Sequence, residues 1–219
     1  MQNKNIFIFG SGKQDNLDYY KNFIKKDSLI IALNGGSDLL KKLNLKPNII
    51  IGDLDSVKNL KNNNLNNDPQ IIKFSTDKDF SDFELASDYI IDHYKTANIL
   101  IFGMFGNRTD HFLFNIEVCK KLLNKKYYPV MYSLSEEIYF IKNKSNFKLS
   151  CNINDIISIL PISNKAHIFE TTGLKYKLMN ETIYPNTTIG LSNIVISKIV
   201  EINLITGQLM IIRTINDKQ

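Results

Sequence analysis

Short apolar runs alternate with helical patterns over the first 140 or so residues, and this alternation limits the possible folds more than any other feature. Six runs have the character of strands, at residues 6–9, 29–33, 48–51, 71–74, 98–102 and 130–132. Between two of these runs, Phe83, Ala86, Ile90 and Tyr94 recur at the spacing of one helical face. Apolar strands separated by helices predict a mostly parallel, three-layer α/β domain, which we place at residues 1–142.

The pattern changes near residue 147, beyond which only strand-like segments follow. These segments are "DIISILPI", "AHIFETTGLKYKL" and "KIVEINLITGQLMIIRT", and a glycine turn divides the last of them into two strands. Because no helical periodicity remains, we expect residues 143–219 to form a second, all-β domain of sandwich-like architecture.

Composition restricts the location and the partners of the chain. The 43% hydrophobic and 22% charged residues are typical of a globular protein. The net charge of +5 comes from scattered lysines, without the clusters or motifs of nucleic-acid binders, so we expect no nucleic-acid partner. Cys119 and Cys151 have no metal-site spacing, and no apolar run reaches the roughly 18 residues of a membrane span. We therefore expect no membrane association and a reducing, cytoplasmic location.

Two familiar phosphate-binding motifs are absent near the N-terminus. The segment "GSGKQD" lacks the earlier glycine and the later Ser or Thr of a P-loop, because Phe7 and Gln14 occupy those positions. Asp15 stands where a dinucleotide fingerprint needs its third glycine. The histidines show no ligand spacing, and we interpret His93 and His167 as ordinary surface or packed residues.

Two aspartates follow the third predicted strand, in "IIIGDLDS". Residues i and i+2 of an extended chain project to the same side, so Asp53 and Asp55 can converge on one point. Their repulsion is relieved if a divalent cation lies between them, and Mg²⁺ binds one or two carboxylates together with phosphate oxygens. Alternatively, Asp55 or Ser56 caps a helix, which accounts for only one of the two carboxylates.

Two further predicted strands also end in polar segments. Asn34-Gly35-Gly36 follows residues 29–33, and glycines between a strand and a helix suit either a phosphate seat or a simple tight turn. In "STDKDFSDFELA", Ser81 caps a helix that begins at Asp82, where the helix dipole alone favours a carboxylate. That explanation leaves the aspartates on either side of the lysine in this segment unexplained.

The fourth polar segment is "GMFGNRTDHFLFNI", after residues 98–102. Arg108 offers a planar fork for phosphate oxygens, or alternatively pairs with Asp110 on the surface. All four segments lie at the carboxyl ends of strands, where parallel sheets bind their ligands. Together they predict Mg²⁺ on a polyphosphate and phosphoryl-type transfer from a nucleotide.

The order of these motifs resembles that of the thiamine pyrophosphokinases over nearly the whole chain. The matching segments are Gly35-Gly36, "GDLDS", "DKDFSD", "GNRTDH", "TTGLKYKL" and "GLSN". In one position the chain departs from the family pattern, because Asn34 stands where the family usually has Asp.

The resemblance implies transfer of the pyrophosphoryl group of ATP to the hydroxyl of thiamine, giving thiamine diphosphate and AMP. It implies catalytic roles for Asp53, Asp55, Asp82, Arg108 and Asp110, with Mg²⁺ on the first three. It implies ATP contacts from Asn34, Gly35, Gly36, Asp77, Lys78, Asp79 and His111, and thiamine contacts from Tyr176, Ser192 and Asn193. It also implies a homodimer with its sites at the subunit interface, in which the β domain binds thiamine and dimerises.

Two alternatives remain compatible with the same residues. A related pyrophosphokinase acting on another alcohol, such as a pterin, shares the aspartate cluster but does not need "TTGLKY" and "GLSN". A nucleotide-binding protein with a weak or inactive site is compatible with Asn34.

Overall fold

The computed structural model describes residues 4–12, 17–25, 27–52, 69–73, 80–106 and 108–216. Contacts within the chain divide it into two units, residues 1–134 and 135–219. The division lies before the strand Glu136–Lys142 (β7), whereas the boundary expected from the sequence follows that strand.

The described part of the first unit contains six parallel strands in the order β6-β5-β1-β2-β3-β4. Their bounds are β1 Lys4–Phe9, β2 Leu29–Leu33, β3 Ile49–Gly52, β4 Gln70–Lys73, β5 Ala97–Phe102 and β6 Val130–Tyr132. Each predicted strand is present, with its ends shifted by two residues at most. The parallel sheet expected from the apolar runs is confirmed.

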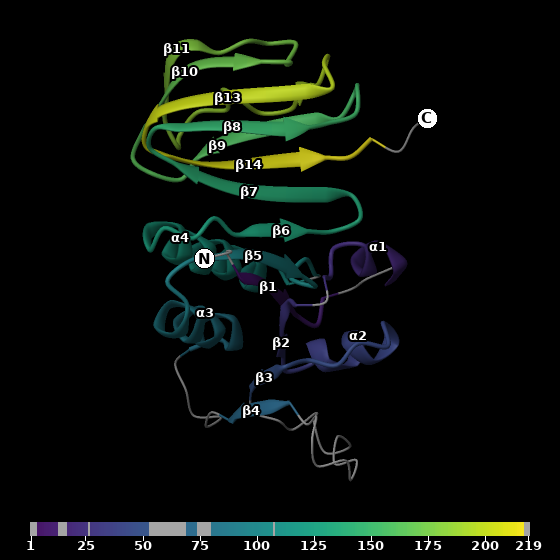
Figure 1. Cartoon of the computed structure of the whole chain (residues 1–219). Coiled ribbons are helices and arrows are strands. Elements are labelled where there is room, and N and C mark those ends of the chain that lie inside the picture. The colour runs from purple at the N-terminus through teal and green to yellow at the C-terminus, as the bar shows by residue number, and fades with distance from the viewer. Residues whose placement is uncertain are drawn as a thin grey trace. The chain divides into compact units, whose positions relative to one another are not determined.

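Among the described residues, four helices cover this sheet: α1 Leu17–Lys21, α2 Gly36–Lys42, α3 Asp82–His93 and α4 Thr109–Asn124. Figure 1 shows α1 and α2 on one face of the sheet and α3 and α4 on the other. The predicted helical face is present in α3, where Phe83, Ala86 and Ile90 are buried. The three-layer α/β architecture is therefore confirmed.

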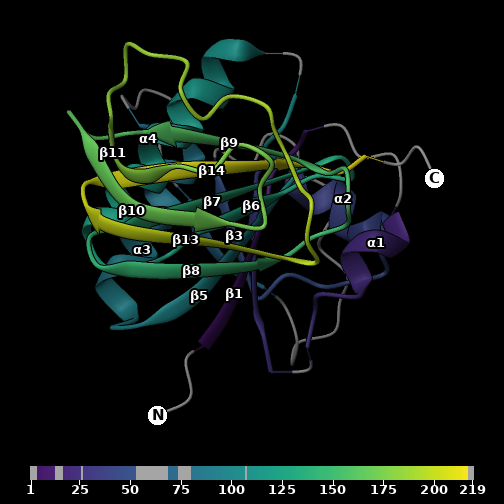
Figure 2. The same cartoon turned by 90° about the horizontal axis from the view of Figure 1, so that it is seen from above.

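The described part of the second unit is all β, as expected. Its strands are β7 Glu136–Lys142, β8 Ser145–Ser150, β9 Ile156–Pro161, β10 Ala166–Thr172, β11 Met179–Ile183, β12 Asn193–Ile194, β13 Ile199–Thr206 and β14 Gln208–Thr214. They form two antiparallel sheets, β12-β9-β14-β7 and β11-β10-β13-β8. Figure 2 shows the second of these sheets in front of β14 and β7. One apolar core contains residues from both sheets, which makes the unit a sandwich.

At two turns of the second unit, consecutive strands enter different sheets. The predicted glycine turn is Gly207, but β13 and β14 on its two sides belong to different sheets. Gly207 has a φ of +95°, and a Cβ there would lie 2.4 Å from the carbonyl oxygen of Lys165, so only glycine fits. The strands β7 and β8 are divided between the sheets in the same way.

No described helix combines the length and the apolar character that a membrane crossing requires.

Candidate active site

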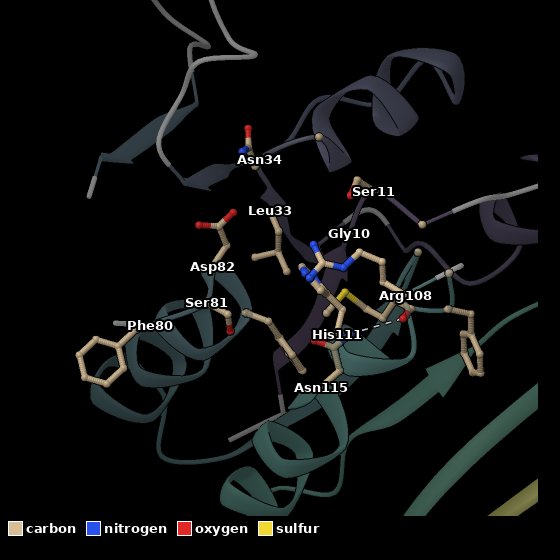
Figure 3. Close-up of a pocket in the computed structure, with 17 residues that line it drawn as sticks. Gly10, Ser11, Leu33, Asn34, Phe80, Ser81, Asp82, Arg108, His111 and Asn115 are labelled. Carbon is tan, nitrogen blue, oxygen red and sulfur yellow. Dashed lines mark hydrogen bonds between the residues drawn. The ribbon is translucent and has the colours of Figure 1, made fainter. Parts of the chain in front are cut away.

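A pocket of about 650 Å³ opens at the carboxyl ends of the parallel strands in the first unit. Loops after β1, β2 and β5 line it together with the first turns of α3 and α4 (Figure 3). The lining residues are 10–12, 33–35, 80–83 and 103–106, with Arg108, His111 and Asn115. Open parallel sheets place their ligands at this edge, so the pocket is the candidate site.

Close backbone contacts shape one wall of the pocket. A Cβ on Gly36, the first residue of α2, would lie 1.9 Å from the carbonyl oxygen of Phe9. Only glycine therefore lets α2 begin against the end of β1. The backbone N–H of Asn34 donates to the carbonyl oxygen of Ile51 at 2.9 Å, which joins the ends of β2 and β3. Asn34 has a φ of +33°, a left-handed conformation that asparagine tolerates better than most residues.

The structure brings Asp82 to the end of β3. Ser81 caps α3, and its hydroxyl accepts from the backbone N–H of Glu84 at 3.2 Å, so the predicted cap is present. A Cβ built on Gly52 would lie 3.3 Å from Oδ2 of Asp82 and 3.1 Å from the Cβ of Asn34. Figure 3 shows the Asp82 carboxylate on the side of the pocket where Asn34 lies. The Asp82 carboxylate and the Cβ of Asn34 therefore both lie beside Gly52, where β3 ends.

Five of the predicted site residues lie outside the described part of the chain: Asp53, Asp55, Asp77, Lys78 and Asp79. Their convergence on a metal or a nucleotide stays a prediction. In sequence, Asp53 directly follows Gly52, the residue beside which Asp82 and Asn34 both lie.

Arg108 and Asp110 form an ion pair at the start of α4. The Nε of Arg108 donates to Oδ1 of Asp110 at 3.1 Å, and a second guanidinium nitrogen donates to Oδ2. This hydrogen bonding from Arg108 lowers the pKa of Asp110 to about 2. The surface pairing that we considered as an alternative is thus present, and the Arg108 side chain also lines the pocket (Figure 3). One arginine therefore has both a carboxylate partner and access to a ligand.

Sequence reasoning missed two parts of this pocket. Residues 10–12 line it although their segment fails as a P-loop, and their position directly after the first predicted strand was the available signal. Asn115 lies four residues after His111 on α4, so both side chains share one helical face. Its amide donates to the carbonyl oxygen of Met104 at 3.4 Å, which links α4 to the loop after β5.

The residues predicted to contact thiamine lie in the second unit. The Tyr176 side chain is 61% exposed, and Nζ of Lys175 lies 5.5 Å from its ring centroid. Asn193 is only 4% exposed and forms hydrogen bonds with both backbone groups of Tyr176. The exposed Ser192 donates its backbone N–H to the hydroxyl of Ser158 at 3.1 Å. The structure therefore brings Tyr176 and Asn193 together, whereas their contact with a ligand stays a prediction.

Comparison with known proteins identifies two family models in this chain. The model described as "Thiamin pyrophosphokinase, catalytic domain" matches residues 20–131. The model described as "Thiamin pyrophosphokinase, vitamin B1 binding domain" matches residues 142–209. The first match falls in the unit that holds the pocket, and the second falls in the unit that holds Tyr176.

Individual relatives cover nearly the whole chain. The thiamine pyrophosphokinase of Bacillus subtilis strain 168 is 28% identical over 222 residues, which cover 96% of this chain and 99% of the relative. A crystal structure of the Bacillus subtilis thiamine pyrophosphokinase superposes with a TM-score of 0.83 at 25% identity, covering 97% of this chain and 100% of the other. The thiamin pyrophosphokinase of Candida albicans shares the fold, with a TM-score of 0.79 at 16% identity and coverage of 98% and 90%.

Proposed function

Because this chain belongs to the thiamin pyrophosphokinase family, we propose that it transfers the pyrophosphoryl group of ATP to the hydroxyl of thiamine. In this reaction the hydroxyl oxygen forms a bond to the β-phosphorus and loses its proton. The bond between the β-phosphorus and the oxygen bridging to the α-phosphate breaks, and AMP leaves with that oxygen. The observation that carries the proposal is that the two family models match in order, one in each structural unit.

We propose that the pocket of the first unit binds the phosphates of ATP. Residues 10–12, Gly35 and Gly36 would bring backbone close to the phosphates, as glycine-containing turns do elsewhere. Arg108 would balance phosphate charge, while its pairing with Asp110 keeps the guanidinium in one orientation. His111, which also lines the pocket, would add a polar contact to the nucleotide.

The oxygen donors near the end of β3 fit a magnesium ion. Asp82 places a carboxylate oxygen there, Asn34 would add an amide oxygen from the adjacent residue, and Mg²⁺ takes oxygen ligands. We propose that Asp82 holds the ion together with Asp53 and Asp55. When bound, it would neutralise charge on the phosphates of ATP. Lys78, Asp77 and Asp79 belong to the same proposed nucleotide site on sequence grounds.

We propose that thiamine binds in the second unit with its ring on Tyr176. Lys175 already places a cation over this ring, at 5.5 Å from the centroid, so the exposed face accepts positive charge. Thiamine carries a positive charge on its thiazolium ring and therefore has the same chemical preference. The exposed hydroxyl of Ser192 would supply a polar contact to the ligand.

Incubation with Mg-ATP and thiamine tests the proposed reaction directly. We expect AMP to form only when thiamine is present, in equal amounts with thiamine diphosphate. Formation of ADP instead would indicate a simple kinase. Thiamine-dependent AMP would be absent if the site were inactive, and a matched incubation with a pterin alcohol would identify the alternative substrate class.

The ion pair at the start of α4 gives a prediction for the pH profile. The hydrogen bond from Arg108 lowers the pKa of Asp110 to about 2, so the carboxylate stays ionised at higher pH. The contribution of a group with a lowered pKa is lost only as the pH falls through that value. Asp110→Asn should therefore lower turnover without moving the acid limb of the profile, measured from about pH 5 to about pH 8. An acid limb that disappears in this variant would contradict the assignment.

We also propose a homodimer whose sites combine residues of both subunits. Support comes from the division of motifs, because the phosphate motifs fall in the first unit and the thiamine motifs in the second. Closed twofold dimers are the commonest oligomers of soluble proteins.

Mixing two defective variants tests the shared site. Asp55→Asn and Tyr176→Ala chains are dissociated, mixed and reassociated, so that about half of the dimers are mixed by random pairing. Each mixed dimer then carries one undamaged site, and activity at low thiamine should recover to about a quarter of the wild-type value. If mixed dimers form but activity is only the average of the two variants, each site belongs to a single chain.

A reducing, cytoplasmic location belongs to the same proposal. Cys119 and Cys151 are both free and buried. Burial raises the pKa of both thiols, that of Cys151 to about 11, so neither is a reactive thiolate at neutral pH. Unpaired, unreactive cysteines are typical of proteins that stay in a reducing compartment.

A further inference from the structure

The side-chain amide of Asn193 forms hydrogen bonds with both backbone polar groups of Tyr176. Its Oδ1 accepts from the backbone N–H of Tyr176 at 3.0 Å, and its Nδ2 donates to the carbonyl oxygen of Tyr176 at 2.6 Å. Asn193 is 4% exposed, whereas Tyr176 is 61% exposed. A buried side chain thus holds the main chain of an exposed aromatic residue.

This pair extends a short antiparallel ladder between residues 173–176 and 193–196. The backbone N–H of Ile196 donates to Gly173 at 2.9 Å, and that of Lys175 donates to Ile194 at 2.9 Å. Between these bonds, Leu174 and Val195 form an isolated bridge. The ladder does not continue by backbone beyond Lys175, because Ser192 turns away with a φ of +54°.

The amide of Asn193 thus binds the backbone of Tyr176 in the way that a neighbouring peptide group would. An asparagine side chain offers a carbonyl acceptor and an N–H donor, the same two groups that a peptide presents to a neighbouring strand. It satisfies both backbone groups of Tyr176, which fixes the direction in which the tyrosine side chain leaves the chain.

Further hydrogen bonds fix the partner strand of this ladder, residues 193–196. The backbone N–H of Val195 donates to the carbonyl oxygen of Asp155 at 2.9 Å, and that of Asn154 donates to Val195 at 2.9 Å. Asp155 is fully buried and accepts from the guanidinium of Arg213 at 2.6 Å and 2.8 Å. The support for Tyr176 thus continues from Asn193 into the core of the sandwich.

We propose that Asn193 is a positioning residue that orients Tyr176 for thiamine and acts on the ligand only through that tyrosine. This inference rests on the proposed function, in which thiamine binds on the Tyr176 ring. It departs from the direct thiamine contact that the resemblance implies for Asn193. A ring held in its binding orientation before the ligand arrives loses less conformational freedom on binding, so the effect should appear in thiamine affinity.

A double-mutant cycle separates action through Tyr176 from direct contact. Tyr176→Ala should raise the KM for thiamine by about 2- to 30-fold, the range for losing one cation–π platform. Asn193→Ala in the wild-type background should raise it by no more than that factor, with kcat and the KM for ATP within about twofold. In the Tyr176→Ala background, Asn193→Ala should add less than about twofold, because no ring remains to be positioned.

One possible result would contradict the role of Asn193, and a different result would contradict the proposed thiamine site. If Asn193→Ala raises the KM by the same factor in both backgrounds, Asn193 contacts thiamine directly and the inference fails, although the proposed function stands. If Tyr176→Ala leaves the KM for thiamine unchanged, thiamine does not bind on this ring and the proposed site itself fails.

Two further variants distinguish a specific effect of Asn193 on Tyr176 from a general destabilisation of the segment that carries Tyr176. Thr171 is buried, and its hydroxyl accepts from the backbone N–H of Leu178 at 2.9 Å, near the other end of the same segment. Thr171→Val removes that bond without touching Tyr176 and should leave the KM for thiamine within about twofold. An effect equal to that of Asn193→Ala would overturn the inference. If Asn193→Ala does not fold, Asn193→Asp, which keeps the acceptor and loses the donor, should show the same non-additivity.

Discussion

Asparagine in place of Asp82 is expected to lower turnover by roughly 10²-fold or more in a protein that remains folded. The carboxylate lies where β3 ends, beside Asn34, and the substitution removes a charge that the proposed reaction needs next to the phosphates. Asp55→Asn, at another predicted ligand of the same ion, should have an effect of the same order. Steady-state assays with thiamine and Mg-ATP over a range of Mg²⁺ concentrations measure both variants.

Asp38→Asn is the matched control for this experiment. Asp38 also lies in the first turn of a helix, α2, but its side chain is 64% exposed and pairs with Lys41 at 3.4 Å. The control therefore removes a carboxylate from a helix start away from the pocket lining, and turnover should stay near the wild-type value. Near-normal turnover of Asp82→Asn, with an unchanged Mg²⁺ dependence, would show that the proposed ion is bound elsewhere.

Alanine at Asp155 should destabilise the second unit by about 3–5 kcal/mol, because it leaves the guanidinium of Arg213 in the core without its closest carboxylate. The side chains of Asp155 and Arg213 are 0% and 11% exposed, and Glu137 is a further partner of the same guanidinium at 3.1 Å. Breaking one side of a buried ion pair costs far more than breaking a pair on the surface. Urea unfolding followed by circular dichroism measures the difference in unfolding free energy.

An exposed ion pair in the same sandwich supplies the comparison. Lys148 and Glu201 are 2.8 Å apart, with side chains 59% and 29% exposed. Glu201→Ala should change the unfolding free energy by less than about 1 kcal/mol. Equal losses in the Asp155 and Glu201 variants would mean that the buried cluster adds nothing beyond an ordinary surface pair.

The local features of this fold were predictable, and its long-range pairings were not. The strands at residues 29–33 and 130–132 were predicted to the residue, because their composition is apolar and β-branched. The cap of Ser81 on Glu84 involves residues three apart, so the sequence pattern shows it directly. Periodicity identified β13 and β14 as strands but carries no information on their partners, so their assignment to different sheets could not be foreseen.

In the candidate site, too, local features were predictable and long-range contacts were not. The polar residues at strand ends, such as Asp82 and Arg108, were predicted because each directly follows an apolar run or opens a helix. The contact of Asn193 with Tyr176 joins residues 17 apart through a side chain, and no spacing rule predicts such a bond. Residues 10–12 were passed over because their role depends on which neighbouring strands surround β1.

The interleaving of strands in the sandwich has a consequence for how the protein reaches its native state. β14 comes last in sequence among the strands of the second unit, yet it lies between β7 and β9 and pairs with both. Neither of those earlier strands can pair with β14 until β14 has left the ribosome, so this sheet cannot be completed progressively during synthesis. Sandwiches closed by such distant pairings fold in milliseconds to seconds, against microseconds for chains with local contacts. We therefore expect a newly made chain to pass through a stage in which the α/β unit is folded while the β unit still exposes strand edges, the species that chaperones would recognise.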